Sequence, residues 1–84
     1  GILVVPATGV GPADVLAGFR AQRRELGQQL ERLQEQRSGI TRRLNQGAEG
    51  VKRGGLEARL AEIDKRIADV DRQIAQADAR VAEY

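Results

Sequence analysis

Few residues in this 84-residue chain could carry out chemistry, because it contains no histidine and no cysteine. Ser38 is its only serine, and no histidine is present to activate it as a nucleophile. Zinc and redox-metal sites need clusters of histidine and cysteine, and haem ligation also relies on these side chains. Carboxylates could hold a hard cation, but no calcium-loop spacing occurs. We therefore expect a protein that is not an enzyme, with no catalytic residue, no metal site, no cofactor and no small-molecule substrate.

The charge balance is only mildly basic. Fourteen Lys and Arg residues stand against 12 Asp and Glu residues, a net charge of +2, which is well short of a dedicated nucleic-acid binder. No apolar run of 18 residues is present, so the sequence predicts no membrane-spanning segment.

The chain divides into an arm and a helical part. Residues 1–12 hold four consecutive aliphatic residues followed by glycine and proline, which predicts an extended apolar arm. In the helical part, 13–84, we expect helices over 13–45 and 54–84, joined by a glycine-rich turn at 46–53. Pro12 suits the first turn of a helix, where its missing N–H costs nothing, and Asp14 suits the positive end of the helix dipole.

Both predicted helices repeat with the 3.5-residue period of a left-handed coiled coil. In the second helix, intervals of four and three residues connect Leu56, Leu60, Ile63, Ile67, Val70, Ile74, Ala77, Val81 and Tyr84. In the first helix, the same intervals connect Leu16, Phe19, Arg23, Leu26, Leu30, Leu33, Arg37, Ile40 and Leu44. We call these two rows the seam.

The two rows match when the chain is folded about Gly50, so that the numbers of paired residues add up to 100. Leu44 then meets Leu56, and Leu30 meets Val70. Every such pair joins an a position to a d position, as an antiparallel coil requires. The predicted fold class is all-α: an antiparallel two-helix coiled-coil hairpin with an extended apolar N-terminal arm.

The charges beside the seam agree only in part with this pairing. Asp78 faces Arg20 and is the only acidic e-position residue of the second helix that faces a cation. On the other side Arg43 faces Arg59, and such unbalanced charges favour outside partners, although exposed pairs are worth at most about 1 kcal/mol. Residues 42–53 carry a net charge of +3, so the turn is either a solvated basic tip or a contact for phosphate or lipid headgroups.

Three further features indicate partner-binding residues. Arg23 and Arg37 lie in the seam; either their aliphatic stems cover it while the guanidinium reaches solvent, or they meet acidic groups of a partner. Helix-one glycines at 18, 27 and 39 are also tolerated more readily if a partner packs nearby. Every b position of the second helix is alanine, which reflects helix propensity or a docking face; these are Ala61, Ala68, Ala75 and Ala82.

The apolar arm is the strongest candidate contact. Its four aliphatic residues cannot all be buried against a two-helix rod whose seam is already filled, and exposed they would form an apolar patch. They are Ile2, Leu3, Val4 and Val5. We expect them to dock on another protein subunit or to contact a membrane surface.

Three functions fit these features. The first is a structural or assembly subunit that braces a larger complex. The second is a nucleic-acid-binding hairpin that uses the arginines of residues 20–43, although acidic residues interrupt them and no aromatic stacking residues lie among them. The third is a coiled-coil arm of a larger envelope adaptor protein.

Residues 13–84 resemble the small coiled-coil hairpin proteins, rich in Arg, Gln and Ala, of GC-rich bacteria. Together with the apolar arm, the hairpin looks like a membrane-extrinsic accessory subunit, and specifically like those that hold a photosynthetic reaction centre within its light-harvesting ring. The resemblance implies partners among the proteins of that complex and a place in the bacterial cell envelope, peripheral to a membrane on its periplasmic side. Gly1 in place of an initiator Met fits either a removed signal peptide or a cropped terminus.

Overall fold

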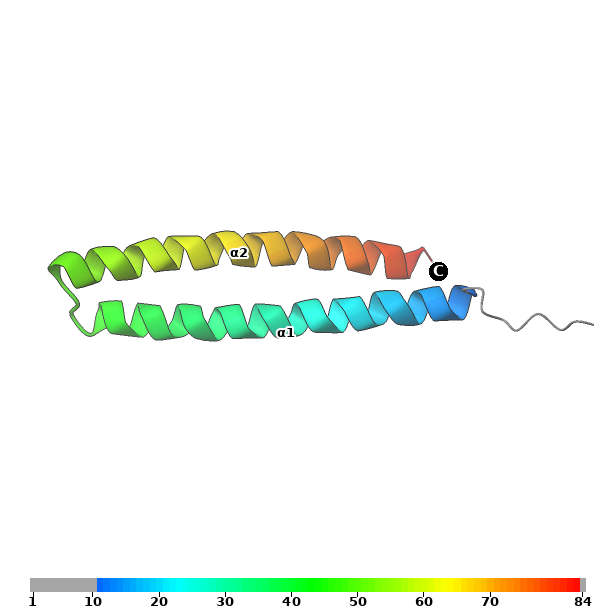
Figure 1. The fold of residues 1–84 in the computed structure, drawn as a ribbon, viewed down its shortest axis with the longest axis horizontal. Helices are drawn as coiled ribbons and strands as arrows, with labels where there is room; N and C mark the ends of the chain where they lie inside the picture. Colours follow the sequence, from blue (N-terminus) through cyan, green and yellow to red (C-terminus); the bar gives the residue numbers. More distant parts are fainter. Residues whose placement is uncertain (1–10, 84) are drawn as a thin grey trace, which may run out of the picture.

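The computed structural model describes residues 11–83, which form two long helices joined by a short turn. Helix α1 spans Pro12–Asn45 and helix α2 spans Gly50–Ala82. The helices lie side by side and antiparallel, so the start of α1 and the end of α2 share one end of a rod (Figure 1). At 1.5 Å per residue each helix is about 50 Å long. The predicted all-α helical hairpin is confirmed, whereas residues 1–10 of the predicted arm lie outside the described residues.

Helix α1 begins where the sequence predicts. Gly11 has extended backbone angles, and its carbonyl accepts hydrogen bonds from the N–H groups of Asp14 and Val15, both at 3.0 Å. The Asp14 carboxylate in turn accepts a hydrogen bond of 3.4 Å from the Gly11 N–H. Pro12 occupies the first turn, where its fixed φ suits the helix and no N–H is needed.

The turn is shorter than predicted. It occupies residues 46–49 rather than 46–53, because α2 already begins at Gly50. Two glycines reverse the chain: Gly47 has a φ of 98° and Gly50 a φ of 65°. Residues with a side chain rarely adopt this left-handed conformation, so these two positions require glycine.

The other two glycines of the predicted turn are helical. Gly54 and Gly55 belong to the second turn of α2, although glycine costs about 1 kcal/mol relative to alanine in a helix. An ion pair of 2.9 Å between Arg53 and Glu57 spans this turn, and Leu56 packs partly buried just after it. Both interactions favour the helix and offset part of the cost of the two glycines, in a segment that local propensity alone assigns to a loop.

The interior consists of the seam. The buried residues all occupy predicted seam positions, and the other described seam residues are partly buried except Arg37, which is exposed. The buried residues are Leu26, Ile40, Ile63, Val70 and Ala77. None of the side chains described in residues 11–83 is less than 2% exposed. Two helices alone therefore bury a line of side chains rather than a layered core.

We expect Leu26→Ala to lower the free energy of unfolding by about 2–3 kcal/mol, because Leu26 is 5% exposed and packs in the cluster around Val70 and Ala77. The measurement is urea unfolding followed by circular dichroism. The matched control is Val51→Ala, which removes apolar atoms from a side chain that is 94% exposed and should change stability by less than about 0.5 kcal/mol. Equal losses in both variants would contradict the seam as the source of stability.

Candidate functional site

The two seam arginines form ion pairs across the hairpin. Arg23 donates through Nε to Oδ1 of Asp78 at 3.0 Å, and Arg37 donates through Nε to Oδ1 of Asp64 at 2.6 Å. All four side chains are between 42% and 57% exposed. The structure therefore gives both arginines an acidic partner within the chain; contact with a second protein stays a prediction for them.

The partner of Asp78 differs from the sequence prediction. Asp78 pairs with Arg23 and not with Arg20. Arg23 lies on the seam itself, where α1 is nearest to α2, whereas Arg20 lies on the exposed flank. A long arginine side chain on the seam reaches the neighbouring carboxylate first, so the heptad position alone does not decide the pairing.

The acidic row of α2 continues between these two ion pairs. Asp64, Asp71 and Asp78 are seven residues apart and so lie on one helix face. The spacing that connects Arg23 to Asp78 places Leu30 opposite Asp71. Within residues 11–83 Asp71 forms no ion pair. The cross-helix ion pairs therefore alternate with an apolar seam residue.

One glycine of α1 has a role in this arrangement. A Cβ atom at Gly27 would lie 3.2 Å from Nη1 of Arg23, whereas Cβ atoms at Gly18 or Gly39 would meet nothing within 4 Å. Gly27 therefore leaves room for the guanidinium that binds Asp78. The sequence suggested an outside partner near these glycines, and at Gly27 the structure supplies a neighbour from the chain itself.

The alanine strip of α2 is on the surface. Its members, Ala61, Ala68, Ala75 and Ala82, are all exposed and recur every seven residues along one face. Both interpretations, helix propensity and close docking of another helix, remain compatible with this position. The remaining predicted contacts, Ile2, Leu3, Val4 and Val5, lie outside the described residues.

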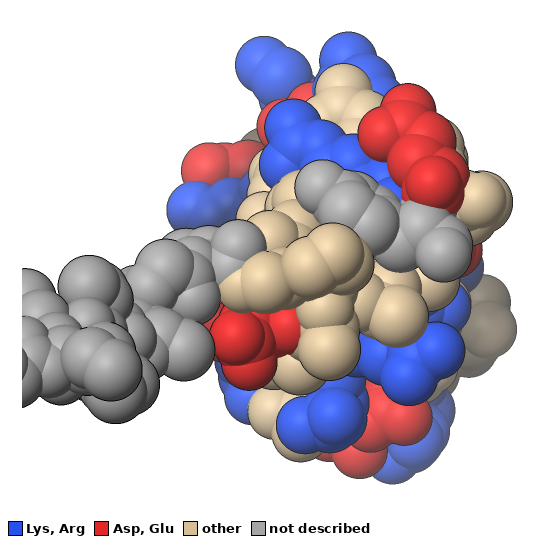
Figure 2. All heavy atoms as spheres, turned by 90° about the vertical axis from the view of Figure 1, so that its right-hand side faces the viewer, with Lys and Arg blue, Asp and Glu red and all other residues tan. Residues whose placement is uncertain are grey.

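The end of the rod that holds the start of α1 and the end of α2 carries charges of both signs. Figure 2 looks along the rod at this end, where basic and acidic side chains are interspersed around the circumference. The guanidinium carbon of Arg80 lies 5.6 Å from the centre of the Phe19 ring, a cation–π contact that joins α2 to α1.

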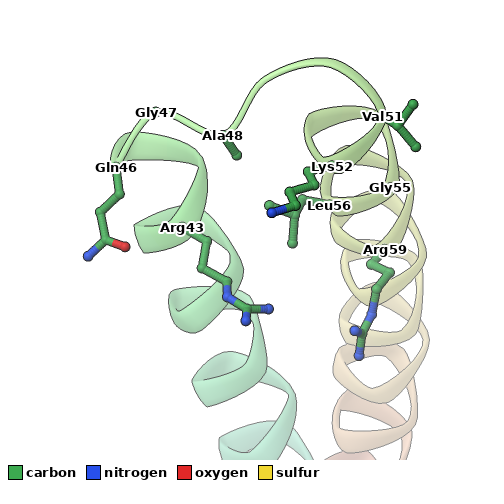
Figure 3. Close-up of a pocket in the computed structure, with 9 residues that line it drawn as sticks. All are labelled: Arg43, Gln46, Gly47, Ala48, Val51, Lys52, Gly55, Leu56 and Arg59. Carbon is green, nitrogen blue, oxygen red and sulfur yellow. The ribbon is translucent and has the colours of Figure 1, made fainter.

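The opposite end of the rod has a different character. A hollow between the helices is lined by Arg43 of α1 and by Lys52, Leu56 and Arg59 of α2. In Figure 3 the side chain of Arg43 extends from α1 toward α2, that of Arg59 runs along α2, and that of Val51 projects outward from the start of α2.

Of the five cations at this end, Arg53 pairs with Glu57. We call the other four, which form no ion pair within residues 11–83, the basic tip: Arg42, Arg43, Lys52 and Arg59.

The sequence revealed this tip only in part. It showed a basic turn and the opposition of Arg43 and Arg59, and both residues line the same hollow. It did not single out Val51, which is 94% exposed. The available signal was the lone apolar residue between Gly50 and Lys52, outside the seam spacing.

A metal site, a membrane-spanning helix or similarity to a known protein would each indicate a function. Within residues 11–83, no cluster of acidic side chains could hold a metal ion, and neither helix has a stretch long and apolar enough to cross a membrane. Comparisons with protein-family models, curated proteins and solved structures find no match.

We expect the ion pair of Arg37 and Asp64 to contribute about 0.5–1 kcal/mol, because its partners are half exposed and screened by water. A double-mutant cycle with Arg37→Gln and Asp64→Asn, measured by urea unfolding, isolates this coupling energy. Asp71→Asn is the matched control, since Asp71 has no cation partner in the described residues and should show no coupling to Arg37→Gln. Additive effects at Arg37 and Asp64 would contradict the ion pair.

We expect Gly18→Ala to stabilise the hairpin by about 0.5–1 kcal/mol, because alanine favours the helix and the new methyl group meets nothing within 4 Å. Gly27→Ala should gain less, since its methyl group displaces the guanidinium of Arg23. Thermal unfolding of both variants gives the comparison. In an Arg23→Gln background the two substitutions should become equivalent, and a difference that persists there would contradict this account of Gly27.

Proposed function

We propose that the hairpin is a non-enzymatic structural subunit that braces a larger protein assembly. The observation that carries this proposal is the single seam: two helices of matched length bury one line of side chains and leave the rest of the rod exposed. A seam of this size supplies little net stability. Association with a partner would add apolar contacts that the isolated hairpin lacks.

Two surfaces could provide those contacts. The alanine strip of α2 consists of small exposed side chains, so a partner helix could approach its backbone closely. The four aliphatic residues from Ile2 to Val5 would contribute about 1.5–3 kcal/mol each if a partner buried them, before the cost of ordering the arm. Neither surface is needed for the seam.

An assembly role is favoured over nucleic-acid binding by the ion pairs of the first helix. Arg23 and Arg37 belong to the arginine-rich segment 20–43, and both already pair with carboxylates of α2. The remaining arginines of that segment share α1 with Glu25, Glu31 and Glu35. A phosphate backbone along the shaft would therefore meet charges of both signs.

As the setting we propose a membrane-bound bacterial complex, with the hairpin peripheral to the membrane in the cell envelope. The support for this setting is the resemblance of residues 13–84, together with the apolar arm, to membrane-extrinsic accessory subunits. A photosynthetic reaction centre with its light-harvesting antenna is the complex to which that resemblance leads.

The test is gentle purification of the full chain from its native membranes, followed by sizing and by cross-linking from residues 2–5. We expect co-elution with partner subunits in a fixed ratio. Ala68→Arg should reduce that co-elution about tenfold or more, because a long charged side chain blocks close helix approach, whereas Gln28→Arg on the exposed face of α1 should not. A chain that emerges monomeric and unaccompanied would contradict the assembly role.

A further inference from the structure

The positive charge of the molecule is concentrated at one end. Residues 42–59 hold five basic and two acidic residues, whereas the rest of the chain holds nine basic and ten acidic residues. The net charge of the shaft is therefore slightly negative. The excess positive charge belongs to the turn and the helix ends beside it.

Four cations of this end form no ion pair within residues 11–83, whereas four of the shaft arginines do. Along the shaft, Arg23, Arg37, Arg66 and Arg72 each pair with a carboxylate. Among residues 11–83, no carboxylate pairs with any cation of the basic tip, since the nearby Glu57 binds Arg53. In the described part of the chain the tip therefore presents four cations without an ion pair beside the single carboxylate of Glu49, a net charge of +3 for residues 42–59.

Helix stability accounts for only two of the four cations of the basic tip. Arg42 and Arg43 lie in the last turn of α1, where a cation is favourable, but Lys52 lies in the first turn of α2, which contains no acidic residue. The positive end of the helix dipole disfavours a cation there. Arg43 and Arg59 moreover line one hollow from opposite helices, and an anion between them would relieve their repulsion.

An apolar side chain stands beside the charges. Val51 is 94% exposed, the only large apolar side chain in residues 11–83 that is so placed, and it is one of the residues that line the hollow (Figure 3). A free phosphate would pair with the cations but would offer no apolar contact to Val51. A surface that offers phosphate groups next to apolar chains would contact Val51 and the cations together.

We propose that the basic tip binds the phosphate groups of an anionic lipid surface, with Val51 entering the boundary between headgroups and acyl chains. The rod then meets the membrane end-on, because Arg42, Arg43, Val51 and Lys52 flank the turn, while Arg59 lies about 12 Å further along α2. This goes beyond the proposed assembly role and does not depend on it, since pure lipid and the isolated chain suffice to test it. A nucleic acid would offer phosphate groups but no apolar layer for Val51.

The experiment is co-sedimentation of the full chain with vesicles of phosphatidylglycerol and phosphatidylcholine, compared with vesicles of phosphatidylcholine alone. We expect partitioning onto the anionic vesicles that weakens as salt rises. Arg43→Gln and Arg59→Gln should each lower the partition coefficient about fivefold, since one cation near such a surface contributes about that factor. Val51→Ser should lower it with the charge unchanged. Arg24→Gln and Arg32→Gln remove exposed shaft cations and should have little effect.

Four outcomes would overturn the proposal. Equal losses from tip and shaft variants would show non-specific charge attraction. Equal binding to neutral vesicles, unaffected by tip variants, would show attachment through another part of the chain. Inorganic phosphate that shifts the amide resonances of the tip without any vesicle binding would show a free-phosphate site. Tighter binding to duplex DNA at the same salt, lowered by the shaft variants, would show a nucleic-acid interface. Circular dichroism of each variant confirms that the helices are retained.

Discussion

Two helices that cover only each other can bury side chains along one line. This constraint decides where most leucine, isoleucine and valine residues of the hairpin lie: all but Val15 and Val51 of those in residues 11–83 recur at intervals of three and four residues, and the buried positions fall on those intervals. No second layer of side chains covers the seam in residues 11–83. The arginines on the seam therefore reach its exposed edge, where Asp64 pairs with Arg37 and Asp78 pairs with Arg23.

The same constraint explains which parts of the fold could be predicted from the sequence. The hairpin, its antiparallel pairing and its seam follow from periodicity, because heptad spacing determines which face of each helix is apolar. The start of α2 could not be read in this way. Gly54 and Gly55 indicate a loop by local propensity, yet the helix starts four residues earlier than predicted, and the exposed ion pair of Arg53 with Glu57 offsets only part of the cost of the two glycines.

The candidate surfaces were predictable to different degrees. Heptad positions identified the exposed alanine strip. They did not identify the partner of Asp78, because the length and direction of an arginine side chain decide whether Arg23 or Arg20 reaches it. The basic tip is assembled from both helices, so Arg59 joins it only through the antiparallel pairing. Val51 is exposed because the early start of α2 places it in the first helical turn, outside the seam.

The same seam pairing could also form between two copies of the chain. Residues whose numbers add up to 100 would meet equally well if the second helix came from another copy. A chain with a straightened turn would thus form the same layers as a domain-swapped antiparallel dimer, about twice as long. Gly47 and Gly50 interrupt the helix with left-handed conformations and so favour the closed form. The two turn glycines, rather than the seam, therefore distinguish the closed hairpin from an exchanged dimer.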